Sequence, residues 1–307
     1  MDLSIVIINW NTRDMLRDCL QTVFDGLGSL RAEVIVVDNA STDGSPLMIE
    51  EEFSQVVLVT NAQNRGFAAA NNQGFALAKG RHVLLLNSDT LVLGDTLPAM
   101  VAWMDAHPAA GVMGPRVLNR DGSMQVSATG FPTLGRLVAQ TLGLTRLQAF
   151  DGYRMERWDR RSERRVEVIS GCCMLVRGAA LQKVGPLDDS FFFYGEETDW
   201  CRRFAKAGWE VVFAPVGEIV HFGGGSVRKL NHKRDVMLTE GTVRLHRKHG
   251  GFAAGLACYG LLFGFNLSRA MAWGLAAPAG GQEARARAAH FARVVADYPK
   301  AWPGRSA

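Results

Sequence analysis

The first third of the chain alternates short apolar runs with segments of helical spacing. The runs are rich in β-branched and aliphatic residues and too short to be helices: "LSIVIINW" (3–10), "EVIVVD" (33–38), "VVLVT" (56–60) and "HVLLLN" (82–87). A strand that is apolar at nearly every position is buried on both faces, which is typical of parallel strands joined by helices. The alternation therefore predicts an α/β fold, a mainly parallel sheet with helices on both faces.

Capping and turn residues lie between and after these runs. Thr12 is placed to cap a helix that runs to Phe24, and Ser45 with Pro46 is placed to start the next helix. Further along, "NRDGS" (119–123) is typical of a hairpin turn. These signals predict repeated strand–helix units followed by a less regular region.

Composition excludes some classes of protein. The chain has 307 residues and a hydrophobic fraction of 48%, enough for one large core or two modest ones. A net charge of +4 is small for this length, so we expect no nucleic-acid partner. Two basic runs, 154–165 and 228–235, are consistent with solvated surface or with contacts to phosphate or an anionic membrane.

The cysteines indicate a reducing compartment. No Cys-x-x-Cys spacing occurs among Cys19, Cys172, Cys173, Cys201 and Cys258, which argues against a disulfide framework and a zinc knuckle. The N-terminus starts directly with a strand and has no leader pattern. We therefore expect a cytoplasmic protein.

Acidic residues follow two of the apolar strands. In open α/β sheets, ligands bind where the carboxyl ends of the strands meet. A single aspartate after a strand is typically a turn former or a helix cap. Asp38 and Asp89 both follow such strands and are flanked by Asn or Ser, which favours a polar ligand at this edge.

Seven motifs, in their order and spacing, resemble glycosyltransferase family 2, and the rhamnosyltransferase-like branch in particular. They are "SIVIINWN" (4–11), "VVDNASTDGS" (36–45), "NRGFAAANNQG" (64–74), "LLLNSDT" (84–90), "SGCCMLVRG" (170–178), "FFFYGEETDWCRR" (191–203) and "VHFGGGS" (220–226). The resemblance covers about residues 3 to 250. It implies a GT-A fold with a nucleotide-sugar donor across the carboxyl edge of the sheet.

The resemblance also implies which residues bind the donor. Asp38 would accept a hydrogen bond from a ring N–H of the pyrimidine base, and Asn9 would line the same pocket. Asn64, Gly66 and Asn72 match the donor-side loop and helix start, where glycine lets the backbone approach the nucleotide. Read from the residues alone, Gly66 is equally consistent with a loop-to-helix turn.

The segment Asn87-Ser88-Asp89 stands where the family carries its metal-binding Asp-x-Asp. The resemblance implies a divalent metal, Mg²⁺ or Mn²⁺, held by Asp89 against the donor diphosphate, with Asn87 and Ser88 in the donor site. Asn87 replaces the first aspartate, so the metal should be held loosely until donor phosphates complete its shell.

A histidine adds to this expectation. A lone histidine after an apolar strand is typically structural, but the resemblance implies a metal-binding role for His221. The glycine-rich loop 223–226 that follows lacks bulk and is suited to close over a diphosphate.

A helix with an acidic first turn is predicted at "EETDWCRRFAKAG" (196–208), and acids commonly favour a helix N-terminus. An inverting sugar transfer needs one carboxylate to accept the proton of the acceptor hydroxyl. The family pattern is Glu-Asp, and Glu197 occupies the Asp position. We favour Glu197 over Glu196 as this base, with Asp199 and Arg203 as an i, i+4 supporting pair.

The later segments have weaker signals. The region 118–165 is an insertion within a catalytic domain of residues 1–250, and "FPTLGRLVAQTLGL" (131–144) predicts a short helix. The resemblance implies that this insertion faces the acceptor. A phosphate on the acceptor would then meet basic side chains of the insertion, namely Arg154, Arg157, Arg160 or Arg161.

Residues 251–307 are predicted to form a C-terminal helical segment. Its apolar stretch "FAAGLACYGLLFGF" (252–265) is shorter than the roughly 20 residues that span a bilayer. It predicts either a core helix or a helix in the membrane interface, and we favour the interface because the family often uses lipid-linked acceptors. The last 27 residues predict an amphipathic helix with a loose tail.

These expectations define one main function and its alternatives. By family likeness the donor is dTDP-rhamnose, with UDP and GDP sugars as alternatives, and the acceptor is a saccharide or a polyprenyl-diphosphate-linked sugar at the inner face of the cell membrane. The departures at Asn87 and Glu197 leave open a non-catalytic nucleotide-sugar-binding or scaffold protein. A nucleotidyltransferase is disfavoured, because the N-terminus lacks a glycine-rich loop with a basic residue. The oligomeric state is not indicated.

Overall fold

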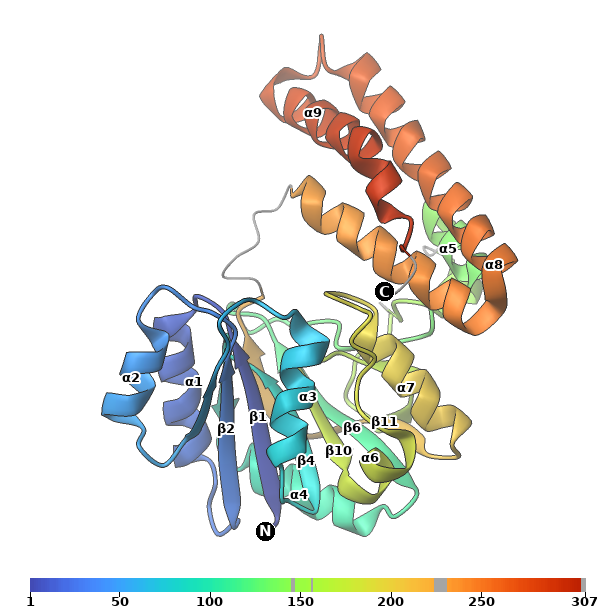
Figure 1. Ribbon diagram of the computed structural model, residues 1–307. Helices are drawn as coiled ribbons and strands as arrows, with labels where there is room; N and C mark the ends of the chain where they lie inside the picture. Colours follow the sequence, from blue (N-terminus) through green and yellow to red (C-terminus); the bar gives the residue numbers. More distant parts are fainter. Residues whose placement is uncertain (145–146, 156, 224–230, 305–307) are drawn as a thin grey trace. The chain divides into compact units, whose positions relative to one another are not determined.

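The computed structural model describes residues 1–304 except 145–146, 156 and 224–230 (Figure 1). The chain forms two compact units. The first consists of Met1–Phe131, Asp151–Phe192 and Glu197–Gly225, and the second of Pro132–Phe150, Phe193–Glu196 and Ser226–Ala307.

The first unit is built on a nine-stranded sheet with the order β3-β2-β1-β4-β10-β6-β11-β5, in which β8 also pairs with β11. Its strands are β1 (Leu3–Asn9), β2 (Ala32–Asp38), β3 (Val57–Thr60), β4 (His82–Asn87), β5 (Thr90–Leu93), β6 (Ala110–Leu118), β8 (Arg164–Arg165), β10 (Cys173–Arg177) and β11 (Glu210–His221). A small separate sheet pairs β7 (Ala128–Thr129) with β9 (Val168–Ile169).

Strands β1 to β4 are parallel, as the apolar runs predicted. The rest of the sheet is mixed. Strand β10 is antiparallel to β4 and β6, and β11 is parallel to β6 but antiparallel to β5. The predicted α/β fold with a largely parallel sheet is therefore confirmed, and its antiparallel strands were not predicted.

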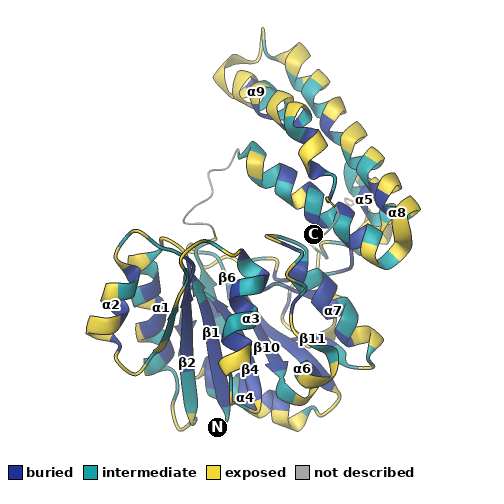
Figure 2. Ribbon diagram, viewed as in Figure 1, coloured by how far each residue is buried: buried dark blue, intermediate teal, exposed yellow. Residues whose placement is uncertain are grey.

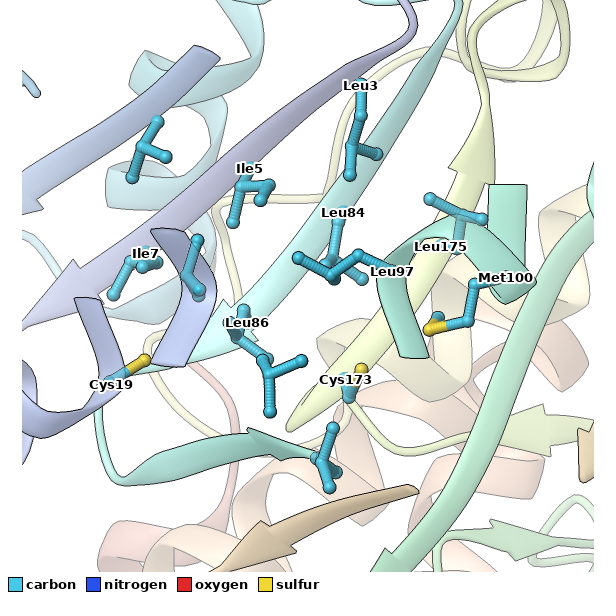
Figure 3. Close-up of a cluster of buried hydrophobic side chains, with 14 of the residues drawn as sticks. Leu3, Ile5, Ile7, Cys19, Leu84, Leu86, Leu97, Met100, Cys173 and Leu175 are labelled. Atoms are coloured by element: carbon cyan, nitrogen blue, oxygen red, sulfur yellow. The ribbon is translucent and has the colours of Figure 1, made fainter. Parts of the chain in front are cut away.

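Helices cover both faces of this sheet (Figure 1). On one face, α1 (Arg13–Asp25), α2 (Ser45–Glu52) and α4 (Thr96–Ala106) pack against alternate strand residues such as Ile5 and Leu84 (Figure 3). On the other face, α3 (Phe67–Leu77), α6 (Gly178–Val184) and α7 (Glu196–Lys206) pack against the intervening residues such as Val6 and Leu85. Both faces are buried, which explains why the strands are apolar throughout.

Two predicted helix caps differ in the structure. Helix α1 follows Thr12, but the Thr12 side chain does not cap it; instead, Asp43 Oδ2 accepts the Arg13 N–H at 2.8 Å. Ser45 is the first residue of α2 and not its cap, because Gly44 takes the cap position with φ = 82°. The prediction of a Thr12 side-chain cap is wrong because its hydroxyl has a partner at the sheet edge, described below.

The region after β6 contains the two features that the sequence predicted. Leu118 bridges Met124, and the Asn119 N–H donates to the Ser123 carbonyl at 2.8 Å, so residues 119–123 form a hairpin turn. In the second unit, α5 (Leu134–Thr141) starts at Thr133, whose hydroxyl accepts the Arg136 N–H. A short 3₁₀ turn, η2 (Gln148–Phe150), follows.

The second unit contains two long helices. Helix α8 (His232–Ala276) has a kink at Gly251, where φ is 81°, and α9 (Gly281–Asp297) packs along it before the 3₁₀ turn η3 (Tyr298–Ala301). The Tyr298 hydroxyl donates to the Tyr259 carbonyl at 2.7 Å, and Val294 is fully buried. The amphipathic helix predicted near the C-terminus is thus confirmed as α9.

The apolar stretch predicted at 252–265 belongs to a longer helix than expected, since α8 continues to Ala276. By length and composition α8 could cross a membrane, and 17% of its most apolar window is buried inside the protein. Both α8 and α9 carry many exposed residues (Figure 2). Compact units need not be domains, so the predicted boundary at residue 250 remains a prediction.

Helix α3 lies unusually close to β1. A Cβ atom added at Gly74 would overlap Val6 Cγ1, and both residues are buried. The missing side chain lets the helix approach the central strand, and the same helix starts at the carboxyl edge of the sheet. Close packing of this pair therefore sets the position of the α3 N-terminus.

We predict that Gly74→Ala destabilises the protein by about 1–2 kcal/mol. Overpacking costs about 1–3 kcal/mol, partly offset by up to about 1 kcal/mol from the better helix propensity of alanine. In a Val6→Ala background the same change should be neutral or stabilising, because the overlapping methyl group is gone. Urea unfolding of the four proteins of this double-mutant cycle measures the coupling. An equal cost in both backgrounds would contradict the packing explanation.

Candidate active site

Strand pairing aligns three polar side chains at one edge of the sheet. Asn9 is opposite Asp38 in the β1–β2 pair, and Ile8 is opposite Asn87 in the β1–β4 pair. All three strands are parallel, so their carboxyl ends meet there. The register thus brings together residues that are 29 and 78 positions from Asn9 in the sequence.

Hydrogen bonds hold Asp38 rigidly. Asn9 Nδ2 donates to Asp38 Oδ1 at 2.8 Å, and the Ser41 N–H donates to Asp38 Oδ2 at 2.9 Å. Asp38 is 2% exposed. Each carboxylate oxygen retains acceptor capacity, so Asp38 can still accept a hydrogen bond from a ligand N–H.

The hydroxyl of Thr12 links this group to the β4 end. It donates to Asn9 Oδ1 at 2.6 Å and lies 2.8 Å from Ser88 Oγ. Because the Thr12 proton is used on Asn9, the Ser88 hydroxyl donates to Thr12. Thr12 was missed as a site residue because serine and threonine before a helix are typical caps.

Asn39 organises the loop before α3 and was also missed. Its Nδ2 donates to Asn64 Oδ1 at 2.9 Å, and its Oδ1 accepts the Arg65 N–H at 3.0 Å. Asn64 Oδ1 additionally accepts the Gly66 N–H at 2.9 Å. An asparagine after a strand resembles a turn residue in the sequence, so only the folded loop reveals this role.

Gly66 and Asn72 have structural roles. A Cβ at Gly66 would lie 2.7 Å from the Phe192 carbonyl oxygen, and its φ of 83° also favours glycine. The Asn72 amide pairs with the backbone of Leu187, through Nδ2 to the carbonyl at 2.8 Å and Oδ1 to the N–H at 3.0 Å. Their predicted contacts with a donor remain predictions.

The turn after β4 brings Asp89 and His221 together. Strand β5 pairs with the end of β11, so that Thr90 is opposite His221. His221 Nε2 lies 3.2 Å from Asp89 Oδ1 and 3.3 Å from Asn87 Nδ2. The two residues proposed from the resemblance as metal ligands are therefore neighbours.

This pair fits a divalent cation. Two adjacent ligands of an octahedral cation of the Mg²⁺ type are about 3 Å apart, close to the separation of Nε2 and Oδ1. Burial raises the pKa of the nearby Cys172 thiol to about 11, which disfavours its thiolate form near neutral pH. Within the described residues, no group of three or more His, Cys, Asp or Glu could hold a metal ion. Asn87, water and a phosphate are suited by their oxygen atoms to act as further ligands.

Glu197 lies near the same edge through the turn at 170–172. The Asn87 N–H donates to the Cys172 carbonyl at 3.0 Å, which fixes this turn beside the end of β4. A Cβ at Gly171 would lie 3.8 Å from Glu197 Cβ, so the turn also contacts the start of α7. Glu196 is 4% exposed, whereas Glu197 is partly exposed, and the choice of Glu197 as the base remains a prediction.

The predicted pair of Asp199 and Arg203 is present in α7. Arg203 Nε donates to Asp199 Oδ2 at 2.9 Å, and Asp199 is fully buried. The guanidinium also donates to the Val184 and Pro186 carbonyls at 3.1 and 2.6 Å. Arg203 thus fixes α7 to the end of α6, and its support of Glu197 remains a prediction.

The basic side chains predicted to contact the acceptor differ in their exposure. Arg160 is 3% exposed, and its guanidinium donates to the Trp158 and Arg154 carbonyls, so it supports its own loop. Arg154, Arg157 and Arg161 are exposed. The glycine loop at 223–226 and the start of the basic run at 228–235 lie largely outside the described residues.

The sequence places the chain in a known family. The pattern of "Glycosyl transferase family 2" matches residues 4–185, more than half of the chain. The chain belongs to this family and is a transferase, as its motifs predicted.

Two relatives illustrate the match. The chain is 33% identical over 202 residues to the N-acetylglucosaminyl-diphospho-decaprenol L-rhamnosyltransferase of Mycobacterium tuberculosis, covering 61% of this chain and 66% of that protein. It is 25% identical over 224 residues to the low-salt glycan biosynthesis hexosyltransferase Agl10 of Haloferax volcanii, covering 72% of this chain and 67% of that protein. The chain thus spans about two thirds of these relatives.

Solved structures confirm the GT-A fold. The mannosyltransferase PcManGT from Pyrobaculum calidifontis, in complex with GDP-Man and Mn²⁺, aligns with a TM-score of 0.57 and 18% identity over 97% of this chain and 82% of its own. GalNAc-T7 with UDP, GalNAc and Mn²⁺ also gives 0.57, with 17% identity over 80% of this chain and 47% of its own.

We predict that Arg203→Met destabilises the protein by about 3 kcal/mol or more. The change removes the guanidinium that pairs with the buried Asp199 carboxylate, and loss of one partner of a buried ion pair is costly. Arg17→Met is the matched control, because Arg17 pairs with Glu52 on the surface and should cost less than about 1 kcal/mol. Urea unfolding measures both, and equal costs would show that the Asp199 pair does not hold α7.

Proposed function

We propose that this protein is an inverting glycosyltransferase that transfers a sugar from a nucleoside-diphosphate donor to a saccharide or lipid-linked acceptor in bacterial cell-surface polysaccharide synthesis. The observation that carries this proposal is the convergence of Asp38, the Asp89–His221 pair and Glu197 at one edge of the sheet. In a family 2 glycosyltransferase, Asp38 would bind the nucleotide base of the donor, and the Asp89–His221 pair would hold a cation at the donor diphosphate. Glu197 would accept the proton of the acceptor hydroxyl.

The donor would lie along the strand ends. Asp38, which Asn9 and Ser41 orient, would accept a hydrogen bond from the nucleotide base. Asn64 and Gly66 would border the nucleotide, because the Asn39 network fixes their loop at the end of β2. Asn72 would border the nucleotide from α3, and it also anchors the neighbouring segment through Leu187.

Asp89 and His221 would hold Mg²⁺ or Mn²⁺. The bound cation would supply positive charge that stabilises the departing diphosphate. Asn87 and Ser88 lie beside this pair and would line the phosphate site. Support comes from the fit of the Asp89–His221 separation, and Mn²⁺ is present in the complexes of two proteins that share the fold.

Glu197 would accept the proton of the acceptor hydroxyl as that oxygen attacks the anomeric carbon. Its position at the start of α7 favours the ionised form, because the helix N-terminus carries partial positive charge. Attack from the face opposite the diphosphate would invert the anomeric configuration.

For the donor sugar we favour rhamnose carried by dTDP, with UDP and GDP sugars as alternatives. The relative from Mycobacterium tuberculosis is an L-rhamnosyltransferase acting on a decaprenol diphosphate carrier, by its name. The acceptor would correspondingly be a polyprenyl-diphosphate-linked sugar, reached from the cytoplasmic side of the membrane.

Asp89→Asn and Glu197→Gln should each lower kcat/KM about 100-fold or more while the thermal unfolding temperature stays near that of the wild type. Removing a general base typically costs a factor of 10²–10⁴, and loss of Asp89 removes the one carboxylate of the proposed metal pair. A radiolabelled sugar-transfer assay measures the effect. Glu50→Gln and Asp14→Asn, which change exposed acids of α2 and α1, are the controls.

Full transfer activity in both variants would contradict the proposed mechanism. Binding of a nucleotide sugar to the wild type by calorimetry, with no turnover on any acceptor, would instead support the alternative of a non-catalytic nucleotide-sugar-binding protein. Asn87, which stands in place of a carboxylate, is the observation that keeps this second candidate.

An apolar face of α8 is the proposed membrane contact. Arg269 is the one charged residue between His249 and Glu283. Six large apolar side chains at roughly helical spacing are exposed there, namely Phe252, Leu256, Phe263, Leu267, Met271 and Leu275. The preceding stretch 244–249 carries Arg and Lys residues suited to anionic headgroups.

Surface contact is favoured over a membrane crossing because of the partner helix. Helix α9 packs along α8 and carries charged side chains along its length: Glu283, Arg285, Arg287, Arg293 and Asp297. Such a helix would be costly to bury in lipid. The apolar face would therefore lie in the interface, with α9 toward water.

The triple variant Leu256→Ser, Leu267→Ser, Met271→Ser should bind vesicles of anionic phospholipid about tenfold more weakly than the wild type. Losing buried apolar area weakens interfacial binding at about 25 cal/mol per Å². Co-sedimentation measures the partition. The control removes exposed apolar side chains of the first unit, Leu47→Ser with Leu77→Ser. Equal binding by the triple variant and the control would contradict the membrane face.

A further inference from the structure

A chain of hydrogen-bonded side chains connects the hairpin turn after β6 to His221. His221 Nδ1 lies 2.7 Å from Gln125 Oε1, and Gln125 Nε2 donates to Asn119 Oδ1 at 2.9 Å. Asn119 Nδ2 donates to Ser123 Oγ at 2.9 Å, and the Ser123 hydroxyl donates to Asp121 Oδ1 at 2.6 Å. We call these four residues, Asn119, Asp121, Ser123 and Gln125, the amide relay.

The relay has a direction because it ends on a carboxylate. Hydrogen bonds from the Ser123 hydroxyl and backbone N–H lower the pKa of Asp121, so this group is ionised and only accepts. Ser123 must then donate to Asp121 and accept from Asn119. Each amide has one donor end and one acceptor end, so the same direction passes through Asn119 to Gln125. Gln125 therefore presents its oxygen to the imidazole.

We propose that Gln125 and Asn119 are positioning residues that hold His221 in the tautomer with a proton on Nδ1, leaving the Nε2 lone pair directed at Asp89. An imidazole binds a cation through an unprotonated nitrogen, and the hydrogen bond of the other nitrogen sets which one that is. The use of this lone pair for a metal rests on the proposed function, whereas the tautomer itself does not.

Asn87 supports the same tautomer from the opposite side. Its Nδ2 lies 3.3 Å from His221 Nε2, so an amide N–H is available to this lone pair. A carboxylate at position 87 would add a second acceptor beside Asp89 and would favour a proton on Nε2 instead. Asparagine at position 87 can donate to the Nε2 lone pair, which an ionised aspartate could not do.

The alternative tautomer is a real competitor. A proton on Nε2 could be donated to Asp89 Oδ1 at 3.2 Å, and the nitrogen would then be unable to bind a cation. The relay opposes this outcome only if Gln125 keeps its orientation. Its backbone N–H donates to the Val117 carbonyl at 2.8 Å, and the Asn119 and Gly122 bonds close the turn, so the whole relay is built on one rigid hairpin.

The tautomer can be measured directly, without metal or activity. Two-bond ¹H–¹⁵N correlation spectra of the full-length protein with ¹⁵N-labelled histidine, at about pH 8.5 and so above the usual histidine pKa of about 6.5, distinguish the two neutral forms. The wild type should show His221 protonated on Nδ1. Gln125→Met, of similar length but without an acceptor, should move most of the signal to the Nε2-protonated form.

Three further variants sharpen the test. Gln125→Glu retains an acceptor for Nδ1–H and should keep the wild-type tautomer. Asn119→Leu removes the acceptor of Gln125 Nε2 and should give a mixture of the two His221 tautomers. This variant also tests the proposal if Gln125→Met fails to fold. Gln21→Met, on the exposed surface of α1, is the control. A wild-type protein protonated on Nε2, or an unchanged tautomer in both Gln125→Met and Asn119→Leu, would overturn the proposal.

A measurement of Mn²⁺ affinity tests the proposed metal site independently of the His221 tautomer. Mn²⁺ binding in the presence of dTDP, measured by electron paramagnetic resonance, should weaken about 10- to 100-fold in Gln125→Met and much less in Gln125→Glu, as for other residues that orient metal ligands. A shifted tautomer with unchanged Mn²⁺ affinity would support the relay and contradict His221 as a metal ligand. A wild type that binds no Mn²⁺ would contradict the metal part of the proposed function and leave the tautomer result to decide the relay.

Discussion

The register of β1 with its two neighbours is the constraint on which the candidate site depends. Asn9 is opposite Asp38 and one residue beyond Ile8, which is opposite Asn87. A shift of one residue would turn these side chains to the other face of the sheet and would exchange the side chains that pack against the two helix layers, such as Ile5 and Val6. Because both faces of β1 are buried under helices, the hydrophobic core itself enforces the register. The edge proposed to bind the donor is therefore positioned by packing that lies deep in the sheet.

The remaining parts of the site are attached to this edge by antiparallel pairs. Strand β10 starts beside the end of β4, which brings the turn at Gly171 and then Glu197 toward Asn87. The pairing of β5 with β11 brings His221 to Asp89 across 132 residues of sequence. The parallel half thus carries the residues proposed to bind the nucleotide, and the mixed half carries the groups proposed for metal binding and proton transfer.

The local parts of this structure could be predicted, and the non-local parts could not. Continuous apolar runs identified β1 to β4, and the spacing of Asp199 and Arg203 predicted their ion pair, because both signals lie within a few residues. The antiparallel position of β10 depends on pairing between distant segments, which leaves no periodic signature. Asp89 and His221 were brought together in advance only through the resemblance to a family. Thr12 was misassigned because its hydroxyl has a better partner in Asn9 than in its own helix.

Two of the residues that sequence reasoning missed share a chemical property. Asn39 and Gln125 are neutral amides, and each uses both its oxygen and its nitrogen to orient a neighbour. An amide can orient a neighbouring group without adding charge, which matters at a site proposed to accept a diphosphate. Additional carboxylates would repel that anion, and lysines near Asp89 would compete with a cation. Such a site has few charged side chains and is consequently difficult to recognise from the charge pattern of the sequence. The directions of its hydrogen bonds can nevertheless be deduced once the fold is known.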